Sequence, residues 1–250
     1  MLSKTYTKYI QSLHGKKGRD VHHAFIAEGS KVVMELLNNG KIVCTNILAT
    51  AAWIKENDAY IKASFNGPLE LIEQFELERI SSLSTPNNVL AVFEKPKATT
   101  VEVAGRITLV LDEIQDPGNL GTIIRIADWF GVQAIVCSES CADCFNPKVV
   151  QSSMGSIGRV ALSYTNLQTW LKANNSVPIY AAALGGINTY QLKKLTSAIL
   201  IIGNESRGIS KDILQLALKK ITIPRIGKAE SLNAAVATGI ILSHLVSGTE

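Results

Sequence analysis

The sequence has no long apolar run. Hydrophobic residues make up 46% of its 250 residues, yet no stretch approaches the roughly 20 apolar residues of a membrane-spanning helix. The apolar core of a secretory signal is also missing, because residues 1–17 are polar and basic. We therefore expect neither a membrane partner nor secretion, and predict a cytoplasmic protein. A chain of this length can bury one large core or two modest ones.

Cysteine is scarce, with four residues in the chain, and a disulfide framework is not expected in a chain with this much apolar sequence. Cys137, Cys141 and Cys144 have the C-x3-C-x2-C spacing that holds an iron–sulfur cluster in radical S-adenosylmethionine enzymes. A zinc site is a second alternative, although no fourth ligand is evident. Only 106 residues follow Cys144, too few for the larger barrel such clusters normally open. Packed thiols are the simpler interpretation, so no metal is predicted.

Charge of one sign is not in large excess, since the net charge is +4. The distribution is more informative, because the first 19 residues carry five basic side chains and no acidic one. We interpret residues 1–21 as a basic N-terminal arm with a short helix and a turn at 14–18. Lys16, Lys17 and Arg19 are its candidate RNA contacts, and an ordinary solvated surface is the alternative.

Short strands and helices alternate between residues 22 and 97, which predicts a small α/β domain. Ser30 is the expected N-cap of the first helix, and Asn39-Gly40 its expected end. A polar, proline-containing stretch follows, and we place a linker at 98–105. The expected strands are 25–29, 42–48 and 89–93, and the expected helices are 30–37 and about 68–76.

Residues 106–250 repeat the alternation with continuous apolar strands, which predicts a mostly parallel sheet covered by helices on both faces. Ligands of such sheets bind beyond the carboxyl ends of the strands, so the segments that follow strands are the candidates for a site. The expected strands are 107–111, 134–137, 179–184, 199–202 and 221–223, and the expected helices are 119–130, 147–154, 212–218 and 232–246.

Three of these segments carry residues suited to chemistry. The first combines a plausible N-cap, Asn119, with Arg125 in an otherwise apolar helix. The second runs from a buried strand into Gly203-Asn204-Glu205, where Gly203 permits close approach to the backbone. The third follows Ile223-Pro224 with Ser231-Leu232-Asn233, and Ser231 is its expected N-cap. Taken singly, a rim arginine, an ordinary loop and a capped helix explain each segment.

In this order and spacing, the three segments resemble the signature motifs of the SpoU (TrmH-type) RNA ribose methyltransferases of the SPOUT superfamily. The resemblance spans roughly residues 106–246, and residues 146–156 resemble the family's intervening helix. Residues 22–97 are less specifically similar to the small RNA-substrate-binding domain of many members. Many relatives carry arginine where this chain has Gln151, so whether this position makes the family's usual substrate contact is an open question.

The resemblance implies an S-adenosylmethionine-dependent enzyme that methylates a ribose 2′-hydroxyl of rRNA or tRNA, with rRNA favoured by the front domain. It also implies a homodimer and a trefoil-knotted α/β domain at 106–250. Catalysis would involve Arg125, as proton acceptor or phosphate grip, together with Asn119, Glu205, Ser231 and Asn233. The cofactor would be held by Leu184, Gly185, Ile202, Gly203, Ile223 and Leu232. An RNA-binding module of the same fold without transfer activity is the remaining alternative.

Overall fold

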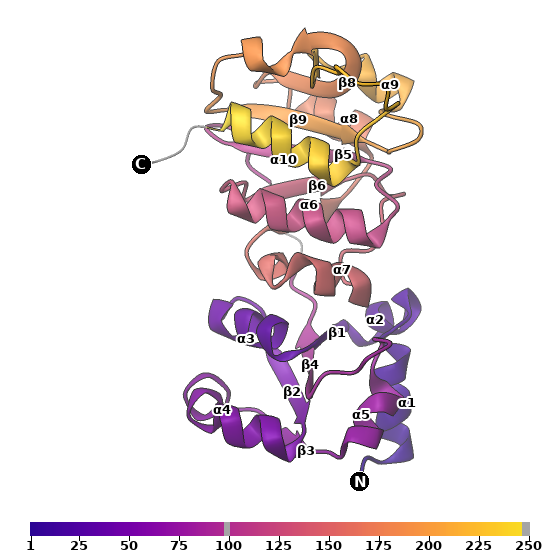
Figure 1. The fold of residues 1–250 in the computed structure, drawn as a ribbon, viewed down its shortest axis with the longest axis vertical. Coiled ribbons are helices and arrows are strands. Elements are labelled where there is room, and N and C mark those ends of the chain that lie inside the picture. Colours follow the sequence, from indigo (N-terminus) through magenta and orange to yellow (C-terminus); the bar gives the residue numbers. More distant parts are fainter. Residues whose placement is uncertain (98–100, 247–250) are drawn as a thin grey trace. The chain divides into compact units, whose positions relative to one another are not determined.

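The computed structural model describes residues 1–97 and 101–246 (Figure 1). The chain divides into two compact units, and each is considered by itself. Unit 1 comprises Met1–Lys97 and Asp143–Arg159, and unit 2 comprises Ala98–Ala142 and Val160–Glu250. Within the described ranges, no helix has both the length and the apolar character needed to cross a membrane.

Unit 1 is built on a four-stranded sheet with the order β1-β4-β2-β3, in which only the β2–β3 pair is parallel. Alternate side chains of β1 and β4 face opposite sides. Ile26 and Val92 pack with α1 and α5, whereas Phe25 stacks on Phe93 and contacts Phe145 beside α7. The elements are α1 (Lys4–Ser12), α2 (Lys16–His22), β1 (Ala24–Glu28), α3 (Ser30–Asn39), β2 (Cys44–Ala49), α4 (Ala51–Ser64), β3 (Leu69–Leu71), α5 (Gln74–Ile80), β4 (Val89–Glu94) and α7 (Pro147–Ser153), which a 3-10 turn at Ser156–Gly158 follows.

Several local expectations for unit 1 are confirmed and others are wrong. The three strands and the end of α3 at Gly40, in the left-handed conformation, agree with the sequence. The helix expected near 68–76 is misplaced, because β3 occupies 69–71 and α5 begins only at Gln74. Gly29 rather than Ser30 caps α3. The turn expected at 14–18 is instead largely the first turn of α2.

Unit 2 is a six-stranded sheet with the order β10-β8-β9-β5-β6-β7, and every neighbouring pair is parallel. Its elements are β5 (Ile107–Asp112), α6 (Pro117–Trp129), β6 (Ala134–Cys137), β7 (Ala161–Tyr164), α8 (Leu167–Ala173), β8 (Ile179–Asn188), a 3-10 turn at Thr189–Gln191, β9 (Ala198–Gly203), α9 (Lys211–Leu214), β10 (Lys219–Thr222) and α10 (Ala234–Leu245). The mostly parallel α/β sheet predicted from the sequence is confirmed.

Helices cover both faces of this sheet. One face packs Val110 and Ile201 against α8 and α9. The opposite face carries α6 and α10, which lie side by side (Figure 1). Val103, within the predicted linker, packs into the core of unit 2, while residues 98–100 lie outside the described residues. β7 and α8 were not expected from the sequence.

Candidate functional site

The three motifs follow strands that end at the same edge of the unit 2 sheet. Asp112, the last residue of β5, pairs in register with Gly203, the last residue of β9. The third motif follows β10, which pairs with the far end of β8 through Thr222 and Asn188. Parallel strands place their carboxyl ends together, which is where open α/β sheets bind ligands. The fold therefore gathers the loops 113–118, 204–210 and 223–233 at one edge.

A chain of side-chain hydrogen bonds joins the three motifs. The Nδ2 of Asn233 donates to Oδ1 of Asn119 at 2.8 Å, and Nδ2 of Asn119 donates to Oε1 of Glu205. Each motif contributes one residue, although the three are 86 and 114 positions apart along the chain. Three of the five predicted catalytic residues are thus in one network.

Two expected helix caps are wrong, and the difference explains how this network forms. Asp116, not Asn119, caps α6 by accepting from the Asn119 N–H at 2.8 Å. Asn119 therefore lies inside the first turn with its side chain free for Glu205 and Asn233. Asn233, not Ser231, caps α10: its Oδ1 accepts from the N–H groups of Ala235 and Val236. The same amide thus caps a helix and holds Asn119.

The loop after β9 is a turn that is closed by two backbone hydrogen bonds and lies against Gly203. Asn204 and Gly208 exchange backbone hydrogen bonds of 3.0 and 2.9 Å, and Gly208 has a φ of +70°. A Cβ on Gly203 would lie 2.4 Å from the carbonyl carbon of Gly208 and the backbone nitrogen of Ile209. A side chain at Gly203 would therefore force this turn away from the edge. The backbone role predicted for this glycine has a steric basis in the fold.

Leu184 and Gly185 lie in a bulge of β8. Ala181 pairs with Lys220 and Ile187 with Ile221, so residues 182–186 leave the ladder between two adjacent residues of β10. Gly185 has a φ of +72°, and the Leu184 side chain is 68% exposed. Gly186 was missed: its Cβ would meet the Lys220 backbone at 2.5 Å. Two consecutive glycines within a strand were the available signal.

The remaining predicted cofactor residues border the same edge in different ways. Ile202 is buried, so only its backbone can meet a ligand there. Ile223 is half-buried just after β10, and Leu232 is exposed just before α10. Exposed apolar side chains next to accessible backbone groups at glycine residues suit a flat, partly apolar ligand with polar ends. S-Adenosylmethionine, with its adenine and its methionine end, fits this composition.

Arg125 and Ser231 are exposed and stand apart from the network. Among the described residues, no hydrogen bond or ion pair connects either of them to Asn119, Glu205 or Asn233. Arg125 lies on the exposed face of α6 between Thr122 and Trp129, so its guanidinium is accessible to a ligand. An exposed charged group on the helix that also carries Asn119 suits contact with a large anionic substrate.

Arg19 requires a correction to the predicted RNA-binding set. Its side chain is 2% exposed and donates to Asp143 Oδ2 at 2.7 and 3.0 Å and to the carbonyls of Leu13 and His14. The guanidinium is therefore part of the interior of unit 1 and cannot meet RNA. Lys17 is exposed. Lys16 is also exposed and pairs with Asp20.

The cysteines take structural positions rather than forming a ligand set. Cys137, Cys141 and Cys144 are buried and form no disulfide, and no group of three or more His, Cys, Asp or Glu residues suited to a metal occurs within the described ranges. The Sγ of Cys141 accepts from Ile114 N and donates to the Leu111 carbonyl, both at 3.3 Å, which fastens the start of the loop after β5. Hydrogen bonding with Cys137 lowers the pKa of the Cys141 thiol to about 7.

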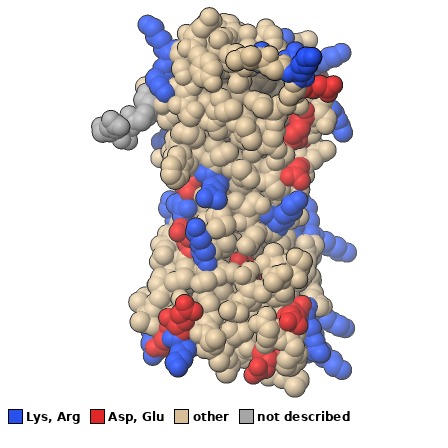
Figure 2. Space-filling view, viewed as in Figure 1, with Lys and Arg blue, Asp and Glu red and all other residues tan. Residues whose placement is uncertain are grey.

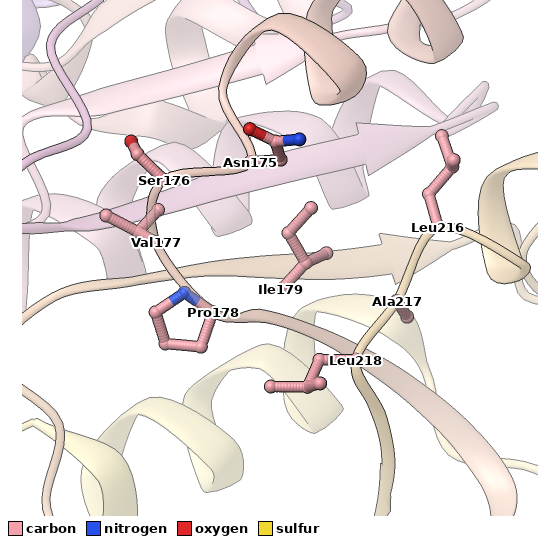
Figure 3. A pocket seen from close by; sticks show the side chains of 8 residues that line it. All are labelled: Asn175, Ser176, Val177, Pro178, Ile179, Leu216, Ala217 and Leu218. Atoms are coloured by element: carbon pink, nitrogen blue, oxygen red, sulfur yellow. The ribbon is translucent and has the colours of Figure 1, made fainter.

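A hollow of about 390 Å³ lies at the opposite edge of the sheet (Figure 3). Its lining comes from the segment before β8 and from the segment between α9 and β10. None of the predicted site residues lies there. The motifs therefore gather at the carboxyl edge, away from this hollow.

Comparison with known proteins identifies the family to which this chain belongs. The model of the SpoU rRNA Methylase family matches residues 106–243, and that of the MRM3-like substrate binding domain matches residues 4–91. The chain belongs to the SpoU rRNA methylase family. The family recognised from the three motifs is thereby confirmed.

Relatives of this SpoU family member match along nearly its whole length. The Bacillus subtilis 23S rRNA (guanosine(2553)-2′-O)-methyltransferase RlmP is 33% identical over 241 residues, covering 94% of this chain and 93% of RlmP. A TrmH-family protein of Porphyromonas gingivalis is 37% identical with a TM-score of 0.87, covering 98% of each chain. An AdoMet-bound rRNA methyltransferase of Sinorhizobium meliloti is 29% identical with a TM-score of 0.85, covering 99% of this chain and 97% of the other.

Proposed function

We propose that this SpoU family member is an S-adenosylmethionine-dependent RNA methyltransferase that modifies a ribose 2′-hydroxyl of ribosomal RNA. The observation that carries the proposal is the Asn233–Asn119–Glu205 hydrogen-bond chain, which unites the three motifs at the ligand edge of the sheet. The activities named for RlmP and for the Sinorhizobium meliloti protein support rRNA over tRNA. Action on rRNA would place the enzyme in the cytoplasm.

The cofactor would occupy the carboxyl edge of β8, β9 and β10. The backbone at Gly203, the Leu184–Gly185 bulge and the segments at Ile223 and Leu232 would hold it. When bound, S-adenosylmethionine would supply a methyl group carried by a positively charged sulfur. We propose that the C-terminal segment forms the family's trefoil knot here, consistent with the close contact of Gly186 with β10 and the return of α10 to α6.

Side chains of this protein would align the ribose for methyl transfer. A hydroxyl is a poor nucleophile near neutral pH, so its oxygen must be aligned, and its proton must pass to a base or to water as the oxygen gains the methyl group and the carbon–sulfur bond breaks. Glu205 and Asn233 fix the Asn119 amide from both sides, which leaves a rigid polar surface for the ribose. Because a guanidinium normally stays protonated, Arg125 is best suited to grip the neighbouring phosphate. Ser231, in the segment before α10, would help to orient the Arg125 guanidinium.

Unit 1 would bind the RNA outside the modified nucleotide. The substrate-binding family model covers residues 4–91, and Lys16 and Lys17 are exposed within that range. Exposed lysines contribute salt-dependent attraction to phosphate. Gln151, on α7, is partly exposed and neutral, so any phosphate contact at that position would be weaker than an arginine would make.

We further propose that the protein is a homodimer formed through the face of α6 and α10. The α10 sequence contains no Asp, Glu, Lys or Arg, and the middle of this face in Figure 2 is largely uncharged, with charged side chains along its borders. Trp129 is 84% exposed at the end of α6, and Val236 is 50% exposed on α10. Exposed apolar side chains on a surface with few charges mark a protein interface. A second copy of this chain is the proposed occupant.

Charge placed on this face is expected to separate the two copies. Trp129→Glu and Val236→Glu should each convert a dimer to a species near 27.0 kDa, because a carboxylate in an apolar interface loses its hydration without gaining a partner. Light scattering after size-exclusion chromatography measures the mass. Val43→Glu, at an exposed apolar residue of unit 1, is the matched control. A wild-type protein that elutes as a monomer would refute the dimer.

Methyl transfer is tested with labelled S-adenosylmethionine and two RNAs kept apart: unmodified 23S rRNA and unmodified tRNA, each transcribed in vitro. We expect label in the 23S rRNA, at one nucleotide whose 3′ linkage resists alkaline cleavage. A methylated 2′-oxygen cannot attack that linkage, so resistance reports the position of the methyl group. Label at a linkage that remains alkali-labile would mean base methylation and would overturn the proposal. Cofactor binding without label in either RNA would favour an RNA-binding module.

A further inference from the structure

Glu113 has an unusual backbone conformation at the end of β5. Its φ is +57°, in the left-handed region that side chains other than glycine rarely adopt. The other non-glycine residues with positive φ in the described ranges, His23 and Met154, end helices, where this conformation is common. Glu113 instead follows a strand and precedes the first motif. Glycine would adopt this conformation without strain, so the glutamate side chain is expected to have a role.

Three groups of Glu113 are fixed by separate partners. Its N–H donates to Ser138 Oγ at 2.9 Å, its carbonyl accepts from Asn204 Nδ2 at 2.9 Å, and its carboxylate pairs with Arg207 at 3.1 Å. Two of these partners belong to the turn 204–208, whose Asn204 Oδ1 also accepts from the N–H of Arg207. Glu113 therefore connects the loop after β5 to the turn 204–208, which has hydrogen bonds of its own.

The network residues lie on the same two loops. Asn119 is six residues beyond Glu113, and Glu205 is two residues before Arg207, so the Asn119–Glu205 hydrogen bond spans the loops that Glu113 joins. A further tie comes from Asp112, which accepts from the Ser210 N–H at 2.8 Å. We propose that Glu113 and Arg207 form a positioning pair that sets the spacing of these loops for methyl transfer. The inference rests on the proposed function.

Stability does not account for the pair. The Arg207 side chain is 69% exposed and that of Glu113 is 33% exposed, and exposed ion pairs add little to folding. The left-handed backbone at Glu113 opposes folding in addition. The ion pair is weak and the backbone at Glu113 is strained. The geometry that Glu113 imposes on Asn119 and Glu205 explains why a glutamate occupies this position. Substituting it should therefore change the site more than the melting temperature.

The first test compares rates of single-turnover methyl transfer to unmodified 23S rRNA. Glu113→Gln and Arg207→Gln should each lower the rate about fivefold at saturating cofactor, and the double variant should be no slower than either. The exchange Glu113→Arg with Arg207→Glu should recover part of the rate. Glu113→Gly should melt no lower than the wild type while also reacting slowly. Glu102→Gln, which removes an exposed ion pair with Arg106, is the matched control.

The second test does not depend on activity. In protein with labelled asparagine, the Asn119 side-chain amide signals should shift in Glu113→Gln and stay in place in Glu102→Gln. Unchanged Asn119 signals, or losses of rate that add in the double variant, would overturn the pairing. A larger KM for RNA in Arg207→Gln alone would make Arg207 a phosphate contact and would also overturn it. If the wild type transfers no methyl group, the proposed function fails, and the amide signals still decide the positioning.

Discussion

Arg125→Ala is expected to lower the rate of methyl transfer by about 100-fold or more, the usual cost of removing one charged donor from a reaction site. The guanidinium is exposed on α6, the helix that also carries Asn119, and contributes no described contact that stabilises the fold. The melting temperature and the affinity for S-adenosylmethionine should therefore stay close to those of the wild type. Transfer to unmodified 23S rRNA and calorimetric cofactor binding measure the two effects.

Variants of matched chemistry separate the possible roles of Arg125. Arg125→Lys keeps the charge but loses the forked donors, so a phosphate grip predicts partial activity with a raised KM for RNA. A role as proton acceptor predicts instead a rate that rises with pH in the wild type, with the rise shifted to lower pH in Arg125→Lys because lysine loses its proton more readily than arginine. Arg106→Ala, an exposed arginine at the start of β5, should retain full activity. Full activity in Arg125→Ala would remove this residue from the mechanism.

Arg19→Met is expected to destabilise unit 1 by about 3–5 kcal/mol, the usual cost of breaking a buried ion pair from one side. The guanidinium is almost fully buried and satisfies Asp143 as well as the carbonyls of Leu13 and His14. Methionine fills the volume but removes the donor from Asp143 Oδ2 and from both carbonyls. Native-state hydrogen exchange of the β1 amides reports the free energy of opening this unit.

The companion variants test whether burial is the cause. Lys16→Ala removes an exposed ion pair with Asp20 and should cost less than about 1 kcal/mol. Arg19→Met combined with Asp143→Leu should recover much of the loss, because no buried charge remains unpaired. If the β1 amides exchange as slowly in Arg19→Met as in Lys16→Ala, the buried ion pair contributes little to the stability of unit 1.

Strands in this chain were predictable where both faces are buried. β1, β4, β5, β6 and β9 are continuous apolar runs, and the structure places each within about two residues of its expected bounds. Elements with mixed composition were missed or misplaced. α4 buries only Trp53 and Ile61 among 14 residues, so its periodicity is weak, and β3 has three residues with two exposed leucines. Their positions depend on packing against β2 and its neighbours rather than on local pattern.

Helix caps show the limit of local chemistry most clearly. Asp116 and Asn119 are both suitable first residues for α6, as are Ser231 and Asn233 for α10, and capping propensity does not rank them. The structure caps with Asp116 and Asn233. This choice leaves the Asn119 side chain free to bond Glu205 and places Asn233 against it. The motifs therefore indicate candidate catalytic residues, but not the hydrogen bonds that connect them.

The parallel sheet, the family and the loops of the candidate site follow from the sequence alone, because apolar runs and motif spacing are properties of neighbouring residues. Which side chains meet depends on the tertiary structure. It buried Arg19 against Asp143, 124 positions away, and left Arg125 exposed, although both arginines had been assigned to RNA or catalysis. It also held Glu113 in a left-handed conformation beside Arg207. The physical reason is that burial, ion pairing and backbone strain depend on residues distant in sequence, which no local pattern records.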